Sequence, residues 1–224
     1  MADTRAVLFD IDGTLIESGG ASDRAWHRAF MELHGVDVQI SEITGKGVPD
    51  PAVGRQAFKA ALGREPAQEE AEALMRRRLD HLYDEVSNSP GYKVQDGVEE
   101  LLVRLIADGI LLGLTTGNVE EAARIKLARA NLNRFFPFGG FGSDSPDRTA
   151  LTSVALERAS ELAPETIDVN DCFSCGDTPR DVEAGHGAGI RVVGVATGEF
   201  TVEQLKEAGA DAAIASFREG LPLL

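Results

Sequence analysis

Short apolar runs alternate with amphipathic stretches along most of this chain. The first run, Ala6–Phe9, has four apolar residues and no charge, which predicts a strand buried on both faces of a sheet. Further strands are predicted at 110–116, 135–141, 173–176, 191–196 and 212–215. Helical patterns separate these runs, so the strands are expected to be parallel and joined by right-handed crossovers. The pattern therefore predicts an α/β fold.

One region breaks the alternation. No further strand-like run occurs between Ile16 and Ser89, and the pattern there is helical throughout. A purely helical block inside an alternating chain is typical of an inserted module. We therefore expect a core domain made of residues 1–16 and 90–224, and a helical domain over residues 17–89.

Three helices are predicted in this block, at about 22–34, 51–62 and 67–86. Ser22 is a suitable N-cap for the first helix, and Gly35 would end it. The buried face of the first helix is expected to hold Trp26, Ala29, Phe30 and Leu33. The buried stripe of the third is expected to hold Leu74, Leu79, Leu82 and Val86.

Charge and composition narrow the classes of partner. The 224 residues carry a net charge of −15, and the longest basic run is Arg76 to Arg78, so neither nucleic acid nor an anionic membrane is expected as a partner. No apolar stretch reaches the length of a membrane span, and residues 1–5 lack a signal-peptide profile, so a cytoplasmic protein is expected. The two cysteines, Cys172 and Cys175, are interpreted as small buried residues of a strand.

Two carboxylates follow the first strand directly. Asp10 comes at the carboxyl end of the strand, where ligands bind in parallel α/β sheets, and Gly13 lets the chain turn so that Asp12 can face the same site. Such a pair is tolerated if a divalent cation lies beside it or if one carboxyl acts as a general acid. The alternatives are a plain solvated turn and a calcium loop, although the twelfth position of such a loop would be Ala21 rather than Glu.

Four short motifs occur in a fixed order, each at a predicted strand end. They are Asp10-Ile-Asp12-Gly-Thr14, then Thr116-Gly-Asn118, then a cation at Arg148, and last Gly176-Asp177 with Asp181. In this order they resemble the motifs of the haloacid dehalogenase-like hydrolase superfamily, and residues 17–89 resemble its C1 cap. The resemblance covers essentially the whole chain and implies a Rossmann-like core with an inserted all-helical cap.

The resemblance implies a role for each acidic residue. Asp10 would attack a phosphoryl group and form an aspartyl-phosphate, and Asp12 would protonate the leaving alkoxide and then take a proton from water. Mg²⁺ would be held by the Asp10 carboxylate, the Asp12 backbone carbonyl and Asp177. Asp181, one helical turn after Asp177, would hold either a water on the metal or the motif cation. Ordinary charge at a helix N-terminus is the alternative for the last two.

The second motif would bind the phosphate. The Thr116 hydroxyl would donate to a phosphate oxygen, helped by the amides of Gly117 and Asn118 at the start of the next helix. Thr115 faces the other side of the strand and is the alternative if the register is displaced by one residue.

The third motif departs from the common family pattern, in which a Lys shortly precedes a Pro. Arg148 stands there instead and keeps the positive charge, with a solvated surface arginine as the alternative. The loop around Lys46 resembles the specificity loop of the cap, so Lys46 is a candidate contact to the leaving group and Arg55 a weaker one. A solvated Lys46 is the alternative.

The reaction implied is hydrolysis of a small phosphorylated metabolite, of the phosphoglycolate or sugar-phosphate type, by a monomer or homodimer. A 2-haloacid dehalogenase would not need Asp12, since halide leaves without a proton. A phosphosugar mutase of the same superfamily is disfavoured because its members place a His early in the first cap helix, where this chain has Ala21, Ser22 and Asp23. A non-catalytic phosphoacceptor or binding protein is the alternative from another class.

Overall fold

A six-stranded parallel sheet forms the centre of the computed structural model, which describes residues 5–164 and 166–224. The sheet order is β5-β4-β1-β6-β7-β8, with the strand bounds β1 (Ala6–Phe9), β4 (Leu111–Thr116), β5 (Phe138–Phe141), β6 (Phe173–Gly176), β7 (Arg191–Val195) and β8 (Ala212–Ile214). All four residues of the central strand β1 are buried. The predicted α/β class is confirmed. Residues 1–4 and 165 of the predicted core segments lie outside the described residues.

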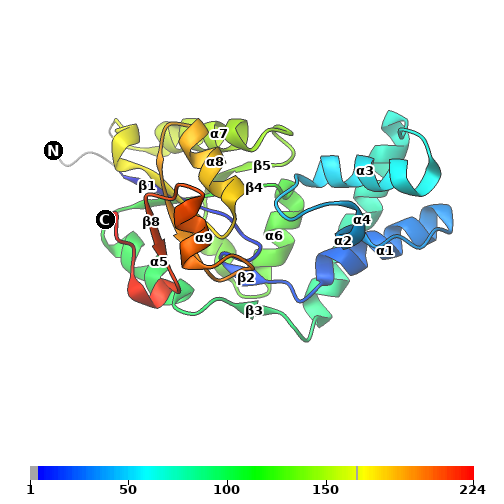
Figure 1. Cartoon of the computed structure of the whole chain (residues 1–224), viewed down its shortest axis with the longest axis horizontal. Coiled ribbons are helices and arrows are strands. Elements are labelled where there is room, and N and C mark those ends of the chain that lie inside the picture. The colour runs from blue at the N-terminus through cyan, green and yellow to red at the C-terminus, as the bar shows by residue number, and fades with distance from the viewer. Residues whose placement is uncertain (1–4, 165) are drawn as a thin grey trace.

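Helices cover both faces of this sheet (Figure 1). One face packs against α5 (Val98–Ala107) and α6 (Glu120–Ala128), and the other against α7 (Arg148–Leu162), α8 (Pro179–Gly187) and α9 (Val202–Glu207). Because the strands are parallel, their carboxyl ends share one edge, and the loops that follow β1, β4 and β6 meet there.

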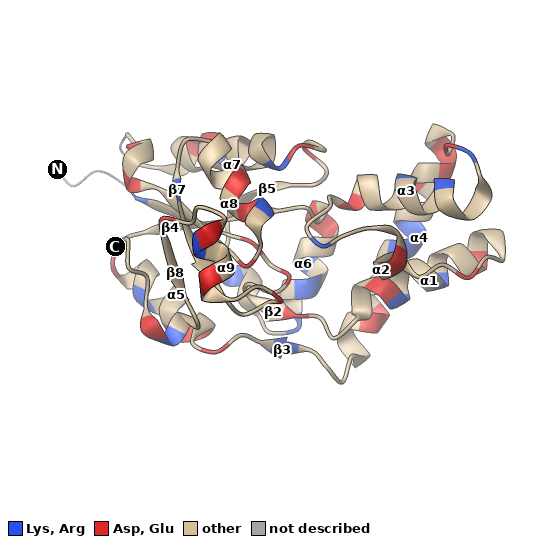
Figure 2. Cartoon of the chain, viewed as in Figure 1, with Lys and Arg blue, Asp and Glu red and all other residues tan. Residues whose placement is uncertain are grey.

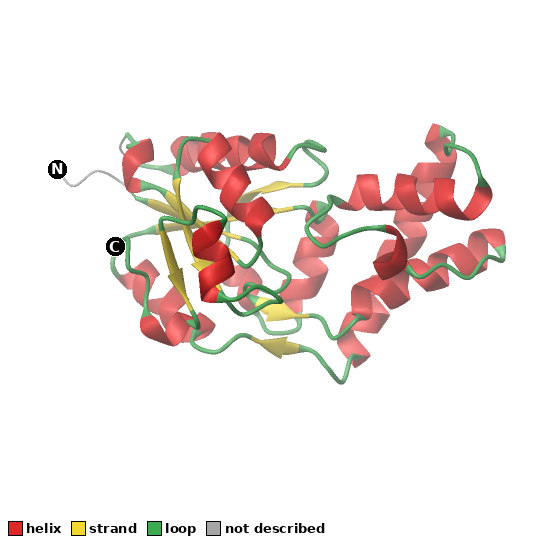
Figure 3. Cartoon of the chain, viewed as in Figure 1, coloured by secondary structure: helices red, strands yellow, loops and turns green. Residues whose placement is uncertain are grey.

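A separate group of helices lies to one side of the sheet (Figure 3). It consists of α1 (Ala21–His34), α2 (Ile40–Ile43), α3 (Asp50–Leu62) and α4 (Gln68–Asn88), and we call it the helical unit. It has its own apolar cluster, which includes Trp26, Phe30 and Phe58. The helical unit gives the sheet edge a second wall.

The structure corrects several details of the predicted helices. The N-cap of α1 is Gly20 rather than Ser22, whereas Gly35 ends the helix in a left-handed conformation as expected. Leu33 is exposed, and α2 was not predicted. The buried stripe of α4 contains Arg78, while Leu79 is only partly buried.

Two very short strands connect the helical unit to the sheet. Strands β2 (Ile16–Glu17) and β3 (Lys93–Val94) pair antiparallel, and neither was predicted. Only Glu17 of these residues falls within the stretch expected to be helical. Two residues per strand are too few to give an alternating pattern, which is why the sequence did not indicate them.

Acidic and basic residues are interspersed over both the sheet and the helical unit (Figure 2). Cys172 and Cys175 are both free and buried, as interpreted from their strand context. Each helix between residues 5 and 224, position 165 apart, is too short or too polar to cross a lipid bilayer.

Candidate active site

A cavity of about 490 Å³ lies between the carboxyl edge of the sheet and the helical unit. Asp10, Asp12, Thr116 and Arg148 line its sheet side, and residues of α1, α2 and the loop around Lys46 line the opposite side. Its volume lies in the range of small-molecule sites, roughly 300–1,000 Å³. All four residues predicted to be catalytic therefore line one cavity.

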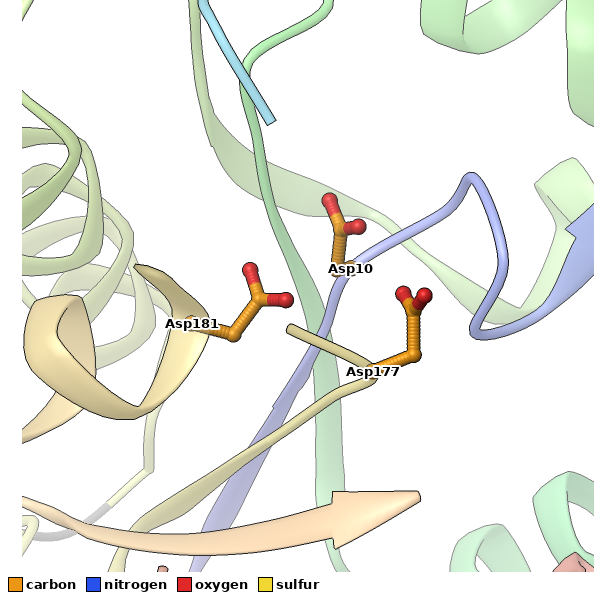
Figure 4. A group of neighbouring side chains, drawn as sticks. All are labelled: Asp10, Asp177 and Asp181. Carbon is orange, nitrogen blue, oxygen red and sulfur yellow. The ribbon is translucent and has the colours of Figure 1, made fainter. Parts of the chain in front are cut away.

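Three carboxylates converge beneath this cavity (Figure 4). Asp10 follows β1, Asp177 follows β6 and Asp181 lies in the first turn of α8, and each offers an oxygen within 4.8 Å of the others. The Asp10 backbone N–H donates to the Cys175 carbonyl at 3.0 Å, which ties the end of β1 to the neighbouring strand. Central parallel strands thus hold two of the three acids on rigid backbone.

Asp10, Asp177 and Asp181 form an acidic trio whose negative charges repel one another. Burial, followed by the negative charge of Asp181, raises the pKa of Asp10 to about 7, although Arg148 opposes the shift. Burial and the charges of Asp181 and Asp10 raise the pKa of Asp177 to about 8. Buried carboxylates that repel one another are stabilised when a cation lies between them.

The donor set fits a small divalent cation. Mg²⁺ prefers carboxylate and carbonyl oxygens, which is what Asp10, Asp177 and the backbone here can supply. A Cβ atom at Gly13 or at Gly198 would overlap the Asp177 carboxylate, so two glycines leave space around that group. The residues therefore suit the metal that the sequence predicts, while the metal itself remains a prediction.

Asp12 lies in a different environment from the trio. Its Oδ2 accepts hydrogen bonds from Asn118 Nδ2 at 2.8 Å and from Lys126 Nζ at 2.6 Å, and its side chain is 40% exposed on the cavity side. Burial acts to raise its pKa, but the Lys126 charge and the Asn118 hydrogen bond outweigh this and lower it. Asp10 and Asp12, only two residues apart, therefore have pKa values shifted in opposite directions.

Sequence reasoning did not identify Lys126. Its side chain is 2% exposed, and Nζ also donates to Asn118 Oδ1 at 2.6 Å. Lys126 lies on α6, whereas Asn118 precedes the first residue of that helix by two positions, so helical periodicity gave no sign of their contact. A buried lysine needs an acidic or polar partner. Asp12 can be recognised as that partner only in the fold, which brings the end of β1 next to α6.

The residues predicted to bind phosphate lie where β4 leads into α6. The Thr116 hydroxyl accepts hydrogen bonds from the Asn118 amide N–H at 3.3 Å and from Asn118 Nδ2 at 2.9 Å. Gly117 and Asn118 line the cavity next to it. The Thr115 hydroxyl instead bonds Thr152 at 2.9 Å on the other side of the strand. Of the two threonines, only Thr116 is placed to contact a bound phosphate.

Arg148 lies at the start of α7 and reaches into the trio. Its guanidinium pairs with Asp181, lies 3.7 Å from Asp10 Oδ1 and donates to the Gly47 carbonyl at 3.2 Å. The second Asp181 oxygen accepts from the Thr178 hydroxyl at 2.7 Å. Asp181 thus holds the cation in this structure, the second of the two roles considered for it. Arg148 is 12% exposed at the side chain and is not a solvated surface arginine.

Lys46 lines the cavity on the side of the helical unit, whereas Arg55 is exposed and does not. Lys46 Nζ forms an ion pair with Glu199 Oε1 at 3.0 Å, across the gap to the loop after β7. The predicted contact with a leaving group is therefore open to Lys46 in position, but its charge already has a partner.

A buried ion pair joins the helical unit to residues 117–119, which connect β4 to α6. Arg78 donates to both oxygens of Asp50 at 3.0 Å, and Asp50 Oδ2 also accepts from the Val119 backbone N–H at 3.0 Å. The Asp50 backbone N–H donates to the Gly117 carbonyl at 2.7 Å. These contacts were not predicted, because a run of three arginines indicates a solvated face rather than a buried residue.

Comparisons with known proteins support the fold and identify the family. Residues 7–195 match the family model described as haloacid dehalogenase-like hydrolase. The chain is similar to the phosphoglycolate phosphatase of Cereibacter sphaeroides, with 29% identity over 83% of this chain and 82% of that protein. It is also similar to the phosphoglycolate phosphatase of Salmonella typhimurium, with 27% identity over 98% and 92%. Among solved structures, a predicted phosphoglycolate phosphatase from Haemophilus somnus covers 98% of this chain and 97% of its own, with a TM-score of 0.74 at 19% identity.

Proposed function

Because the chain belongs to the haloacid dehalogenase-like hydrolase family, we propose that it is a magnesium-dependent phosphatase that hydrolyses a small phosphate monoester through an aspartyl-phosphate. One observation carries this proposal: Asp10 lies on the cavity floor with Arg148 3.7 Å from its oxygen and Asp177 and Asp181 beside it. This arrangement provides a nucleophile, a cation for the phosphate and a site for a metal at one point. Relatives named phosphoglycolate phosphatase support the same class of reaction.

In this proposal Asp10, Asp177 and the Asp12 backbone carbonyl hold Mg²⁺, while Asp181 holds Arg148. When bound, the metal neutralises negative charge so that an anionic substrate can approach the nucleophile. The raised pKa values of Asp10 and Asp177 support this assignment, because burial and the neighbouring carboxylates both disfavour the ionised forms, which a bound cation would stabilise.

The chemical steps belong to the two acids that follow β1. An Asp10 oxygen attacks phosphorus, the bond from phosphorus to the ester oxygen breaks, and the leaving oxygen takes a proton from Asp12. Asp12 then accepts a proton from water as the water attacks the aspartyl-phosphate, and Asp10 is regenerated. Asn118 and Lys126 keep the Asp12 carboxylate on the cavity side throughout.

Other residues hold the phosphoryl oxygens. The Thr116 hydroxyl and the Gly117 and Asn118 amides lie at the N-terminal end of α6, where amide hydrogens and the helix dipole favour an anion. Arg148 contributes a permanent charge beside Asp10 that can stabilise negative charge developing on the phosphoryl group.

Residues 17–89 act in this proposal as a cap domain that excludes water and selects the substrate. The contact from Asp50 to Gly117 and Val119 supports this role, since it joins the helical unit to the sheet edge at the cavity. The proposed substrate is of the phosphoglycolate or the sugar-phosphate type, two types that differ in whether the leaving group carries a negative charge. The proposal also includes a cytoplasmic location and a monomer or homodimer as the working form.

The test is phosphate release from p-nitrophenyl phosphate with and without Mg²⁺. We expect metal-dependent turnover by the parent protein and a loss of at least about a thousandfold for Asp10→Asn. Exposed Glu69 provides a matched control, because Glu69→Gln removes a carboxylate charge from the helical unit away from the cavity. Equal turnover by Asp10→Asn and the parent would reject the proposal.

A further inference from the structure

The charges that line the cavity beyond the phosphate site carry information about the leaving group. Three cations line the cavity, and each is paired with a carboxylate. Lys126 pairs with Asp12 at 2.6 Å, Arg148 pairs with Asp181, and Lys46 pairs with Glu199 at 3.0 Å. None of the three therefore offers an unpaired charge to a second anionic group on a substrate.

Two carboxylates of the same cavity lack such a partner. Glu17 in β2 and Asp23 in the first turn of α1 line the cavity, and neither has a cation within 4.0 Å among residues 5–164 and 166–224. Burial raises the pKa of Asp23 even though the charges of Lys126 and Lys46 oppose the shift. Asp23 is exposed to the solvent in the cavity, and its carboxylate is free to accept hydrogen bonds from a bound ligand.

The remaining polar groups on this side are neutral. Ser22, Ser41 and Thr44 line the cavity with hydroxyl groups that can donate or accept. Counting Glu17, Asp23 and the Lys46 pair with Glu199, the wall facing the leaving group has an excess of two negative charges. This excess repels an anionic leaving group and favours one that is neutral or positively charged.

Building on the proposed function, we infer that the preferred substrate is a phosphate monoester whose leaving group has no negative charge and donates hydrogen bonds to Asp23 and Glu17. Hydroxyl groups of a polyol and the ammonium group of an amino alcohol share this chemistry. A carboxylate on the leaving group, as in 2-phosphoglycolate, would instead face two acids and no unpaired cation. Lys46 in this account holds Glu199 and does not bind a substrate carboxylate.

The experiment compares kcat/KM for glycerol 1-phosphate, phosphoethanolamine and 2-phosphoglycolate, with p-nitrophenyl phosphate as the reference substrate, using the full chain with Mg²⁺. We expect at least one of the first two to exceed 2-phosphoglycolate by about tenfold or more. Comparing glycerol 1-phosphate with phosphoethanolamine shows whether the site prefers hydroxyl or ammonium groups as hydrogen-bond donors. A kcat/KM for 2-phosphoglycolate equal to or above both would overturn the inference.

Variants test whether the two acids cause this preference. Asp23→Asn and Glu17→Gln should each reduce the preference against 2-phosphoglycolate by about threefold or more, while Glu69→Gln should leave it unchanged. Two separate positions keep the test valid if one variant folds poorly. If neither variant changes the ratio, the inference is wrong.

The outcomes also separate this inference from the proposed function. Turnover of p-nitrophenyl phosphate together with a preference for 2-phosphoglycolate would overturn the inference and leave the phosphatase proposal intact. A complete lack of turnover on every ester would overturn both.

Discussion

Lys126 Nζ lies 2.6 Å from Asp12 Oδ2, so the carboxylate proposed to transfer the proton is paired with a buried cation on α6. The Lys126 charge and the Asn118 hydrogen bond lower the pKa of Asp12, whereas burial and the charge of Asp181 raise the pKa of Asp10 to about 7. The lowered pKa favours the ionised form of Asp12, which accepts a proton from water in the second step, and Asp10 can attack phosphorus once a cation offsets the charge of the trio.

The first prediction concerns the charge of Lys126. In Lys126→Met the pKa of Asp12 should rise, so Asp12 becomes ionised, and able to accept a proton from water, only at higher pH. We expect kcat to fall by about tenfold and the acidic limb of the kcat–pH profile to move up by about half a unit or more. The measurement is kcat between pH 5 and 9. A purely structural role for Lys126 would lower kcat without moving the limb, and Lys126→Arg should retain the parent's profile.

The second prediction tests the register of β4. Thr116→Val removes a hydroxyl proposed to contact the phosphate and should lower kcat/KM by about 10–100-fold. Thr115→Val removes a hydrogen bond to Thr152 instead, costing about 1 kcal/mol of stability, and should leave kcat/KM within about twofold of the parent. Kinetics and thermal unfolding of both variants decide the matter. A larger kinetic defect in Thr115→Val would mean that the register is wrong.

The third prediction concerns the buried ion pair of Arg78 with Asp50, which joins the helical unit to residues 117–119. Arg78 is fully buried, so Arg78→Met leaves the Asp50 carboxylate without its cation and should destabilise the fold by about 3–5 kcal/mol. Arg77, its exposed neighbour, provides the control, and Arg77→Met should change stability little. Urea unfolding measures both. Similar midpoints for the two variants would contradict a stabilising role for the pair.

The fourth prediction concerns metal removal and pH. Unfolded carboxyls lose their protons near pH 4, whereas Asp10 and Asp177 in the folded chain retain theirs to about 7 and 8. Between pH 4 and pH 8 the folded chain therefore binds more protons than the unfolded chain. The stability that these two carboxyls contribute is fully present below pH 4 and is lost as the pH rises towards 8. In EDTA the melting temperature should decline over this window.

Mg²⁺ should reduce that decline, because a bound cation favours the ionised carboxylates. Asp177→Asn removes one of the two groups and should flatten the pH dependence measured in EDTA. A melting temperature in EDTA that rises from pH 5 to pH 8, or that is the same with and without Mg²⁺ at pH 8, would contradict the assignment of this site.

The sequence was informative wherever a local pattern decides the structure. The run Ala6–Phe9 became the central strand because a strand buried on both faces must be apolar throughout. Asp10, Asp177 and Thr116 could be placed at one edge because the carboxyl ends of parallel strands share that edge. The order of the motifs then gave each side chain an expected role.

What the sequence missed depends on pairing between distant segments. Arg78 is buried only because Asp50 of another helix meets both of its nitrogens, and Lys126 is buried only because Asp12 lies opposite α6. The balance of charge facing the leaving group depends on Glu17, Asp23 and Glu199, which come from three separate segments. A local sequence pattern does not predict which distant segments meet. The excess of negative charge around the leaving group could therefore be recognised only in the folded structure.

The most direct test of the account is to trap phosphorus on Asp10. In Asp12→Asn the base for the second step is absent, while p-nitrophenolate can leave without a proton, so a phosphorylated chain should accumulate. We expect a burst of one p-nitrophenolate per chain, and mass spectrometry of the acid-quenched protein should place one phosphoryl group on Asp10. Steady turnover of Asp12→Asn without a burst, or a phosphoryl group on another side chain, would contradict the central claim.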